Sequence, residues 1–301
     1  MPLTPEQQAE IDSQRATPRQ TLRAVSEGME NHLYVAHPVL DHGLVRVIDY
    51  MGDDAAICQA ARVSYGKGTK SVQNDEGLIR YLMRHWHSTP FEMCEVKFHV
   101  KLPVFVARQW IRHRTANVNE YSGRYSILDR EFYIPAPEHL AAQSLQNHQG
   151  RGEVLQGAEA QRVLDLLRED AMRSYDSYEA MLSQEGQQGL ARELARMNLP
   201  ANIYTQWYWK VDLHNLLHFL RLRADSHAQY EIRAYADIMC DITRDWVPAA
   251  FGAFQDYRMN AVNLSAQAAD ALRRRLAGEV VTQENAGMGA REWREFQAVW
   301  G

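Results

Sequence analysis

Hydrophobic and polar residues alternate along three stretches of the chain, at residues 45–50, 95–102 and 202–211. In the middle stretch, Val96 and Phe98 fall on one side and the intervening polar residues on the other. Successive side chains of a strand point to opposite faces, so this alternation predicts three half-buried β-strands.

Other stretches repeat their hydrophobic residues every three or four positions, which is the spacing of one helix face. Prolines suit the first turn of a helix, so Thr4-Pro5 and Pro103 mark two further helix starts. We expect Arg112–Arg114 to lie in the last turn of the helix that Pro103 opens, where cations complement the helix dipole. The remaining helices are expected at residues 54–63, 75–86, 159–183, 213–220, 227–246 and 265–277. Few strands among many helices indicate an α+β fold.

Residues 141–158 are rich in glutamine and glycine and are predicted to form a mobile surface connection. The composition is otherwise ordinary for a globular protein, with 46% hydrophobic and 24% charged residues among 301. The net charge of -5 argues against a surface that attracts nucleic acid. The chain has neither a long apolar run nor a signal peptide, so we expect a cytoplasmic protein that does not cross a membrane.

Three cysteines, Cys58, Cys94 and Cys240, are odd in number and far apart. This spacing predicts neither a disulfide framework nor a thiolate zinc site. None of the three has the sequence context of a cysteine nucleophile.

Groups that bind anions are concentrated between Arg112 and Arg124. Arg112-His113-Arg114 is followed by Ser122-Gly123-Arg124, and Glu120 lies between the two groups. Arginine forks match phosphates and planar ring edges, and glycine lets backbone N–H groups approach an anion. A lone RHR tripeptide is typical of a solvated helix end, whereas the whole string indicates a nucleotide site.

This string resembles the RHR-x7-S motif of the flavin-dependent thymidylate synthases, the ThyX family. Further blocks resemble that family in the same order along the chain. They are Ala61–Ser64, His87–Glu92, Arg196 with Leu199–Thr205, and Leu222–Gln229. The resemblance covers roughly residues 45–258.

The resemblance implies a mainly antiparallel sheet flanked by helices, assembled as a homotetramer with shared active sites. It divides the chain into an N-terminal extension (1–44), a synthase domain (45–258) and a C-terminal helical extension (259–301). The implied enzyme is a methyltransferase that converts dUMP to dTMP. Methylene-tetrahydrofolate would donate the one-carbon unit, NADPH-reduced FAD would supply the hydride, and tetrahydrofolate would be released.

The family's dUMP ligands match Gln109, Arg112, Glu120, Tyr121, Ser122, Gly123, Arg124, Arg196 and Arg223. Arg124 and Arg196 can clamp a phosphate with forked donors. Arg223 matches the catalytic residue that polarises the uracil ring. On residue types alone, Arg223 could instead form a structural ion pair with Asp225 or Glu231. His87 matches a histidine near the flavin, folate and nicotinamide, and is the second expected catalytic residue.

The implied FAD contacts are Ser64, Thr89, Arg112, His113, Arg114, Glu120, Asp212, His214, His218 and His227. No GxGxxG motif follows a predicted strand, so a Rossmann site is not expected. Family members often have Asn-x-Arg…Asn where this chain has Asp212, His214 and His218. The two histidines are four residues apart, which is a metal-ligand spacing, but the sequence lacks HExxH or a nearby third ligand and predicts no metal site.

Two other functions fit parts of the sequence. Arg108, Arg112, Arg114 and Arg124 interleave with Trp110, Tyr121 and Tyr125, as in proteins that bind single-stranded nucleic acid. The negative net charge argues against that hypothesis. A histidine-based metallohydrolase is the other alternative, and a chelator would abolish its activity.

Overall fold

The computed structural model describes residues 4–63, 75–144, 150–183 and 188–301. The chain divides into two compact units, Met1–Met259 and Asn260–Gly301. No helix within the described ranges is both long and apolar enough to cross a membrane.

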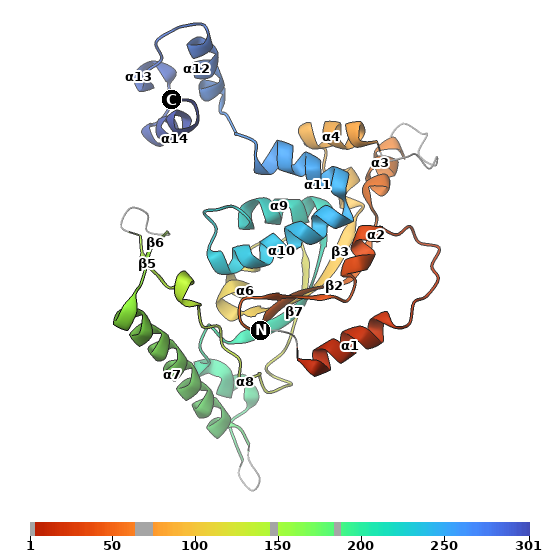
Figure 1. Cartoon of the computed structure of the whole chain (residues 1–301), viewed down its shortest axis with the longest axis vertical. Coiled ribbons are helices and arrows are strands. Elements are labelled where there is room, and N and C mark those ends of the chain that lie inside the picture. The colour runs from red at the N-terminus through yellow and green to blue at the C-terminus, as the bar shows by residue number, and fades with distance from the viewer. Residues whose placement is uncertain (1–3, 64–74, 145–149, 184–187) are drawn as a thin grey trace. The chain divides into compact units, whose positions relative to one another are not determined.

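An antiparallel five-stranded sheet forms the centre of the first unit, in the order β1-β2-β3-β7-β4 (Figure 1). The strands are β1 (Ala36–Val39), β2 (Gly43–Met51), β3 (Glu95–Pro103), β4 (Asn117–Glu120) and β7 (Tyr204–Asp212). The α+β class and the antiparallel sheet are confirmed. The three predicted strands are present as β2, β3 and β7. The short edge strands β1 and β4 were not predicted, because neither has a clear hydrophobic alternation.

Strands β3 and β7 explain how alternation builds the core. Phe98 pairs with Trp209 and Val100 pairs with Trp207 across the two strands. These four side chains are at most 2% exposed and belong to the main hydrophobic core. The intervening His99 is only partly buried, on the opposite face of the sheet.

Two helices, α9 (Leu213–Arg223) and α10 (Tyr230–Trp246), supply much of the rest of that core. The carboxylate of Asp212 caps α9 by accepting the backbone N–H of Asn215 at 2.9 Å. The helix predicted from residue 227 begins at Tyr230, because residues 224–229 form the turn between the two helices. This turn follows Arg223 directly.

Helix α6 (Val104–Trp110) ends earlier than expected, and the prediction that Arg112–Arg114 form its last turn is wrong. Trp110 is fully buried, with its ring centroid 5.3 Å from Trp209 and 4.6 Å from Phe219. The chain must then turn back so that β4 can pair with β7. This tertiary pairing ends the helix and places the RHR tripeptide in the following turn.

Helix α7 (Gly157–Met181) confirms the predicted helix and packs Tyr175 and Tyr178 into a second core with Phe132 and Ile203. The preceding stretch, predicted to be a surface connection, instead contains two paired strands. These are β5 (Ala141–Gln143) and β6 (Arg151–Val154), and residues 145–149 lie outside the described ranges. Long-range contacts of β6, described below, override the glutamine- and glycine-rich composition.

The remaining segments of the first unit are short. Thr4 and Gln7 form a reciprocal capping box that confirms the predicted first helix. The helices are α1 (Pro5–Arg15), α2 (Glu27–His32), α3 (Asp54–Val63), α4 (Glu76–Arg84), α5 (Thr89–Glu92), α8 (Arg192–Ala195) and α11 (Pro248–Phe254). Two 3-10 turns, η1 (Pro137–His139) and η2 (Arg196–Asn198), and a π-helical turn, η3 (Gln255–Met259), complete it.

The second unit has a small core of its own, which includes Trp293 and Phe296. Its helices are α12 (Ala266–Leu276), α13 (Gln283–Ala286) and α14 (Ala290–Trp300). Ser265 caps α12 by accepting the N–H of Ala268 at 3.0 Å, so the last predicted helix is confirmed. Helices α13 and α14 were not predicted.

Candidate active site

The turn after α6 brings its histidine against helix α9. The ring centroid of His113 lies 5.8 Å from that of His218 and 5.5 Å from that of Phe219. Arg112, His113 and Arg114 of the turn, with Asp212, His218 and Arg223 around α9, are called the RHR cluster below. Residues separated by about 100 positions therefore share one end of the sheet.

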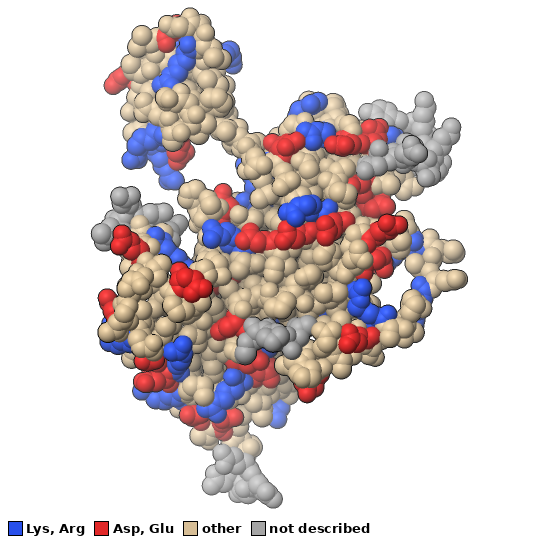
Figure 2. Space-filling view, in the orientation of Figure 1, with Lys and Arg blue, Asp and Glu red and all other residues tan. Residues whose placement is uncertain are grey.

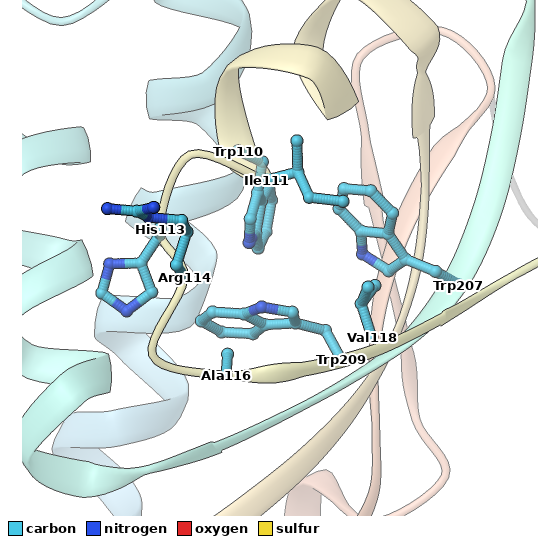
Figure 3. Close-up of a pocket in the computed structure, with 8 residues that line it drawn as sticks. All are labelled: Trp110, Ile111, His113, Arg114, Ala116, Val118, Trp207 and Trp209. Atoms are coloured by element: carbon cyan, nitrogen blue, oxygen red, sulfur yellow. The ribbon is translucent and has the colours of Figure 1, made fainter.

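A pocket of about 210 Å³ adjoins this cluster. Figure 3 shows His113 and Arg114 together at one end of the pocket, with the indole rings of Trp110, Trp207 and Trp209 around the rest of it. The three indole side chains are at most 2% exposed and form a rigid apolar wall, and Arg114 is an exposed cation beside it. A cation next to an apolar wall suits an anionic ligand.

Like charges face each other in the RHR cluster. Burial, and then the charge of Arg112, lower the pKa of Arg223. Burial, and then His218 and Arg223, lower the pKa of His113. Among the described residues, neither arginine side chain makes a hydrogen bond or an ion pair. An anionic ligand would relieve this repulsion.

The alternative role for Arg223, an ion pair with Asp225 or Glu231, is therefore wrong. Asp225 bonds to His227 at 2.9 Å, and Glu231 pairs with Arg151. The bonds from His227 also lower the pKa of Asp225. Both candidate carboxylates are engaged elsewhere, and Arg223 keeps its charge for another partner.

Three expected flavin contacts lie on or beside α9. The Asp212 carboxylate is near enough to His113 to oppose the lowering of its pKa. His214 and His218 line a second, smaller pocket with the ring of Trp86, which lies 3.5 Å from the guanidinium of Arg258. His214 and His218, which stand where family members often have other residues, thus lie in the same region as the RHR turn.

The segment that carries His87 and Thr89 approaches the same helix. Thr89 is the first residue of α5, and α5 packs against α9. His87 is exposed, with its ring centroid 6.0 Å from that of Tyr81. Of the other expected flavin contacts, His227 has a side chain that is 91% exposed, and Ser64 lies outside the described residues.

A second group of expected ligands surrounds residues Ser122–Arg124 and is called the Ser122 loop below. Glu120 accepts a hydrogen bond from Thr205 Oγ1 at 2.9 Å, and the N–H of Tyr121 donates to Gln206 O at 2.8 Å. Strand β7 therefore fixes the approach to this loop.

Arg196 lies directly against the Ser122 loop. A Cβ atom at Gly123 would be 3.4 Å from Arg196 Cδ, so the Arg196 side chain packs directly over the backbone of this loop. Arg124 pairs with Glu193, with Nε and Oε2 3.0 Å apart, and the Ser122 hydroxyl accepts the N–H of Arg124 at 3.3 Å. The structure thus brings Ser122, Gly123, Arg124 and Arg196 together.

The RHR cluster and the Ser122 loop are attached to opposite ends of β7. No hydrogen bond, ion pair or ring contact within the described part of the chain joins them. Gln109, expected to contact dUMP, has a buried Oε1 atom that lacks a partner among the described residues. Such an atom is costly unless a ligand donates to it.

Several residues that hold the site were missed by sequence analysis. Thr205 and Glu193 orient Glu120 and Arg124 from 85 and 69 positions away, so no local spacing could reveal them. Thr205 does lie in a block that resembles the family, and this resemblance was the only feature of the sequence that connected it with the site.

The cysteines offer no nucleophile to this site. All three thiols are buried, and burial raises the pKa of Cys94 and of Cys240 to about 12. The pKa of Cys58 is also raised by burial. A thiolate is the reactive form, so these residues are poor candidates for attack on a substrate.

The structure also weakens the nucleic-acid alternative. Trp110 is fully buried and cannot stack on a nucleic-acid base. On the face in Figure 2, acidic side chains lie beside basic ones over much of the first unit. Within the described ranges, no group of three or more histidine, cysteine or acidic residues is arranged to hold a metal ion.

Comparison with known proteins matches residues 46–249 to the family described as thymidylate synthase complementing protein. A protein of Ruegeria pomeroyi, named flavin-dependent thymidylate synthase, is 80% identical over the whole of both chains. The chain belongs to the family of flavin-dependent thymidylate synthases. The expectation of an enzyme is therefore confirmed.

Other members of the flavin-dependent thymidylate synthase family support the same conclusion. A synthase of Gluconobacter oxydans is 64% identical, covering 99% of this chain and 98% of its own. Among solved structures, the UMP/dUMP methylase PolB from Streptomyces cacaoi, bound with 5-Br dUMP, is 30% identical with a TM-score of 0.66. That match covers 73% of this chain and 97% of PolB.

Proposed function

We propose that this flavin-dependent thymidylate synthase converts dUMP to dTMP with methylene-tetrahydrofolate, FAD and NADPH. The one-carbon unit would form a bond to C5 of the uracil, whose proton leaves. Two electrons from NADPH would complete its reduction to a methyl group, with tetrahydrofolate and NADP⁺ as the other products. The redox chemistry belongs to the flavin when it is bound, and the protein supplies binding, orientation and charge.

The observation that carries this proposal is the pair of arginines, Arg112 and Arg223, which repel each other and which form no ion pair among the described residues. A uracil ring that gains negative charge at its N3–C4 edge would meet Arg223 there. A fixed positive charge stabilises the developing charge without losing a proton itself. Arg223 is therefore the main catalytic residue of the proposal, with His87 as the expected second.

The dUMP phosphate fits the Ser122 loop. Arg124 and Arg196 flank a backbone that Gly123 keeps open, and both arginine side chains can offer two parallel donors to a phosphate. Arg124 is bound to Glu193 in the free chain, so the phosphate would replace a carboxylate oxygen. Glu120, Tyr121 and Gln109 complete the proposed dUMP contacts.

The residues around α9 fit FAD. The pocket beside His113 and Arg114 places the Arg114 guanidinium next to apolar side chains, which suits the pyrophosphate of FAD. Asp212, His214, His218, Thr89, His227 and Ser64 are the other residues proposed to contact FAD. His87 would face the folate and nicotinamide.

We further propose that the RHR cluster of one copy and the Ser122 loop of another form one active site in a homotetramer. This arrangement would explain why no contact in the described part of a single chain joins the two groups. Residues 45–258 would be the catalytic domain, with 1–44 and 259–301 as extensions in a cytoplasmic enzyme.

The proposal is tested by recording the visible spectrum of the purified protein without oxygen, and then adding NADPH with and without dUMP. We expect a flavin spectrum that bleaches, and bleaches faster when dUMP is present. Adding methylene-tetrahydrofolate should then yield dTMP. A colourless protein that neither takes up FAD nor oxidises NADPH would contradict the proposal.

A further inference from the structure

A buried carboxylate at the start of α10 links three segments of the chain, one of which is the turn that follows Arg223. Glu231 is the second residue of α10 and is only 3% exposed. It follows the turn of residues 224–229, which begins directly after Arg223 and contains His227. Because Glu231 directly follows this turn, its contacts can fix the position of the C-terminal end of the turn.

Three side chains donate hydrogen bonds to Glu231. Arg151 Nη2 lies 2.5 Å from Oε1 and 2.6 Å from Oε2. The hydroxyl of Tyr133 donates to Oε1 at 3.1 Å, and Gln229 Nε2 donates to Oε2 at 2.8 Å. Stacked rings of His139 and Tyr230, with centroids 3.6 Å apart, pack beside them.

These donors keep the carboxylate ionised. Burial alone would raise the pKa of Glu231, but the bonds from Arg151 and Gln229 outweigh it and lower the pKa. Glu231 also lies in the first turn of α10, where the helix dipole favours negative charge. A neutral residue of the same shape would lose these interactions.

Two partners of Glu231 lead to segments that carry proposed site residues. Gln229 ends the turn that follows Arg223. Tyr133 is fixed to Asn202 by two hydrogen bonds, from Tyr133 N to Asn202 O (2.8 Å) and from Asn202 Nδ2 to Tyr133 O (3.0 Å). Asn202 lies in the segment that follows Arg196. Glu231 thus connects the Arg223 side of the chain to the Arg196 side.

The 224–229 turn has a defined shape of its own. The N–H of His227 donates to Asp225 Oδ1 at 2.8 Å, and Arg233 Nη1 donates to Ser226 O at 2.8 Å. Since Arg223 has no ion pair among the described residues, its placement depends on the backbone at each end of the turn. The N–H of Ala224, which donates to Leu220 O, holds the α9 end, and the Glu231 contacts hold the other end.

We propose that Glu231, held by Arg151, Tyr133 and Gln229, is a positioning residue: it fixes the 224–229 turn, which contains His227, and through that turn the end of α9 that carries Arg223. This inference rests on the proposed function of Arg223. Misplacing a catalytic group by about 1 Å can cost on the order of a hundredfold in rate. Loss of the carboxylate charge should therefore impair turnover beyond any effect on stability.

The test compares Glu231→Gln with Asp54→Asn in the full-length protein loaded with FAD. Asp54 is a matched control because it is also buried, and it binds the N–H groups of Ala249 and Ala250 away from this turn. Thermal unfolding, kcat and KM for dUMP are measured for each. We expect both variants to unfold at lower temperature, but only Glu231→Gln to lose kcat/KM, by about tenfold or more.

Two further variants keep the test decisive if Glu231→Gln does not fold. Tyr133→Phe removes one donor and keeps the ring, and Arg151→Met changes a side chain that is 37% exposed. Both should lower kcat/KM, Arg151→Met more strongly. Equal kcat/KM in wild type and in these variants would overturn the inference, as would an equal loss in Asp54→Asn. If wild type itself neither binds dUMP nor forms dTMP, the proposed function fails instead.

Discussion

The two halves of the proposed active site hold their positive charge in different ways. In the RHR cluster, Arg112 and Arg223 repel each other and form no ion pair among the described residues, and the adjoining pocket is lined by almost fully buried tryptophans. In the Ser122 loop, Arg124 is exposed and already paired with Glu193. The first group has unused charge on a rigid support, whereas the second exchanges one anion for another. We therefore expect the first to act in the chemical step and the second in binding.

The largest expected effect is that of Arg223→Ala. Removing a preorganised charge from a developing anion typically costs about a hundredfold to a thousandfold in kcat. The variant should keep its fold and its bound flavin, because Arg223 makes no ion pair among the described residues. Arg173→Ala is the control, since it removes an exposed arginine from α7. Unchanged kcat in Arg223→Ala would refute its catalytic role.

Arg196→Ala should act mainly on affinity. A phosphate that loses one charged, forked partner typically loses about 2–3 kcal/mol, or roughly thirtyfold to a hundredfold in binding. We expect the dissociation constant for dUMP to rise by that factor, measured by calorimetry on the FAD-loaded protein. A fall in kcat at saturating dUMP with an unchanged KM would reverse the contrast between the two groups.

A smaller change is expected for Glu193→Gln. Exposed ion pairs contribute only about 0.2–1 kcal/mol, so freeing Arg124 should tighten dUMP binding by a factor of about five or less. The same calorimetric titration checks this. Weaker binding would indicate that Glu193 orients Arg124 for the phosphate and does not compete with it.

The smallest effect concerns stability and pH. Burial lowers the pKa of His113 and of His99 below the ordinary value of 6.5. Below about pH 6.5 the unfolded chain therefore binds more protons than the folded one, and stability falls as the pH decreases through this range. His113→Gln should reduce the loss of Tm between about pH 7.5 and 5.5 by roughly 1–2 °C. An unchanged loss of Tm would show that His113 does not contribute.

Much of the fold could be predicted from the sequence because it depends on local patterns. The alternation in β3 and the helix start at Thr4-Pro5 both depend on neighbours in the chain, and both were predicted correctly. The end of α6 and the β5–β6 pair were predicted wrongly. Each is decided by a distant partner, which is β7 for the first and, we infer, Glu231 for the second.

The candidate site also divides into features that depend on local sequence and features that depend on distant partners. The RHR and Ser122 segments could be found because each is contiguous and rich in anion-binding groups. Their grouping with Arg223 and Arg196 came only from the family resemblance. The engagement of Asp225 and Glu231 by other residues, which leaves Arg223 unpaired in the described chain, could not be derived from spacing.

The most direct test of the central claim is to co-express Arg223→Ala and Arg196→Ala chains with different tags and purify the mixed oligomer through both. At a low dUMP concentration, each variant alone should form dTMP at no more than about a few per cent of the wild-type rate. If one active site combines the RHR cluster of one chain with the Ser122 loop of another, the mixed oligomer contains some intact sites and should form dTMP. A mixed oligomer as inactive as its parents would contradict the shared site.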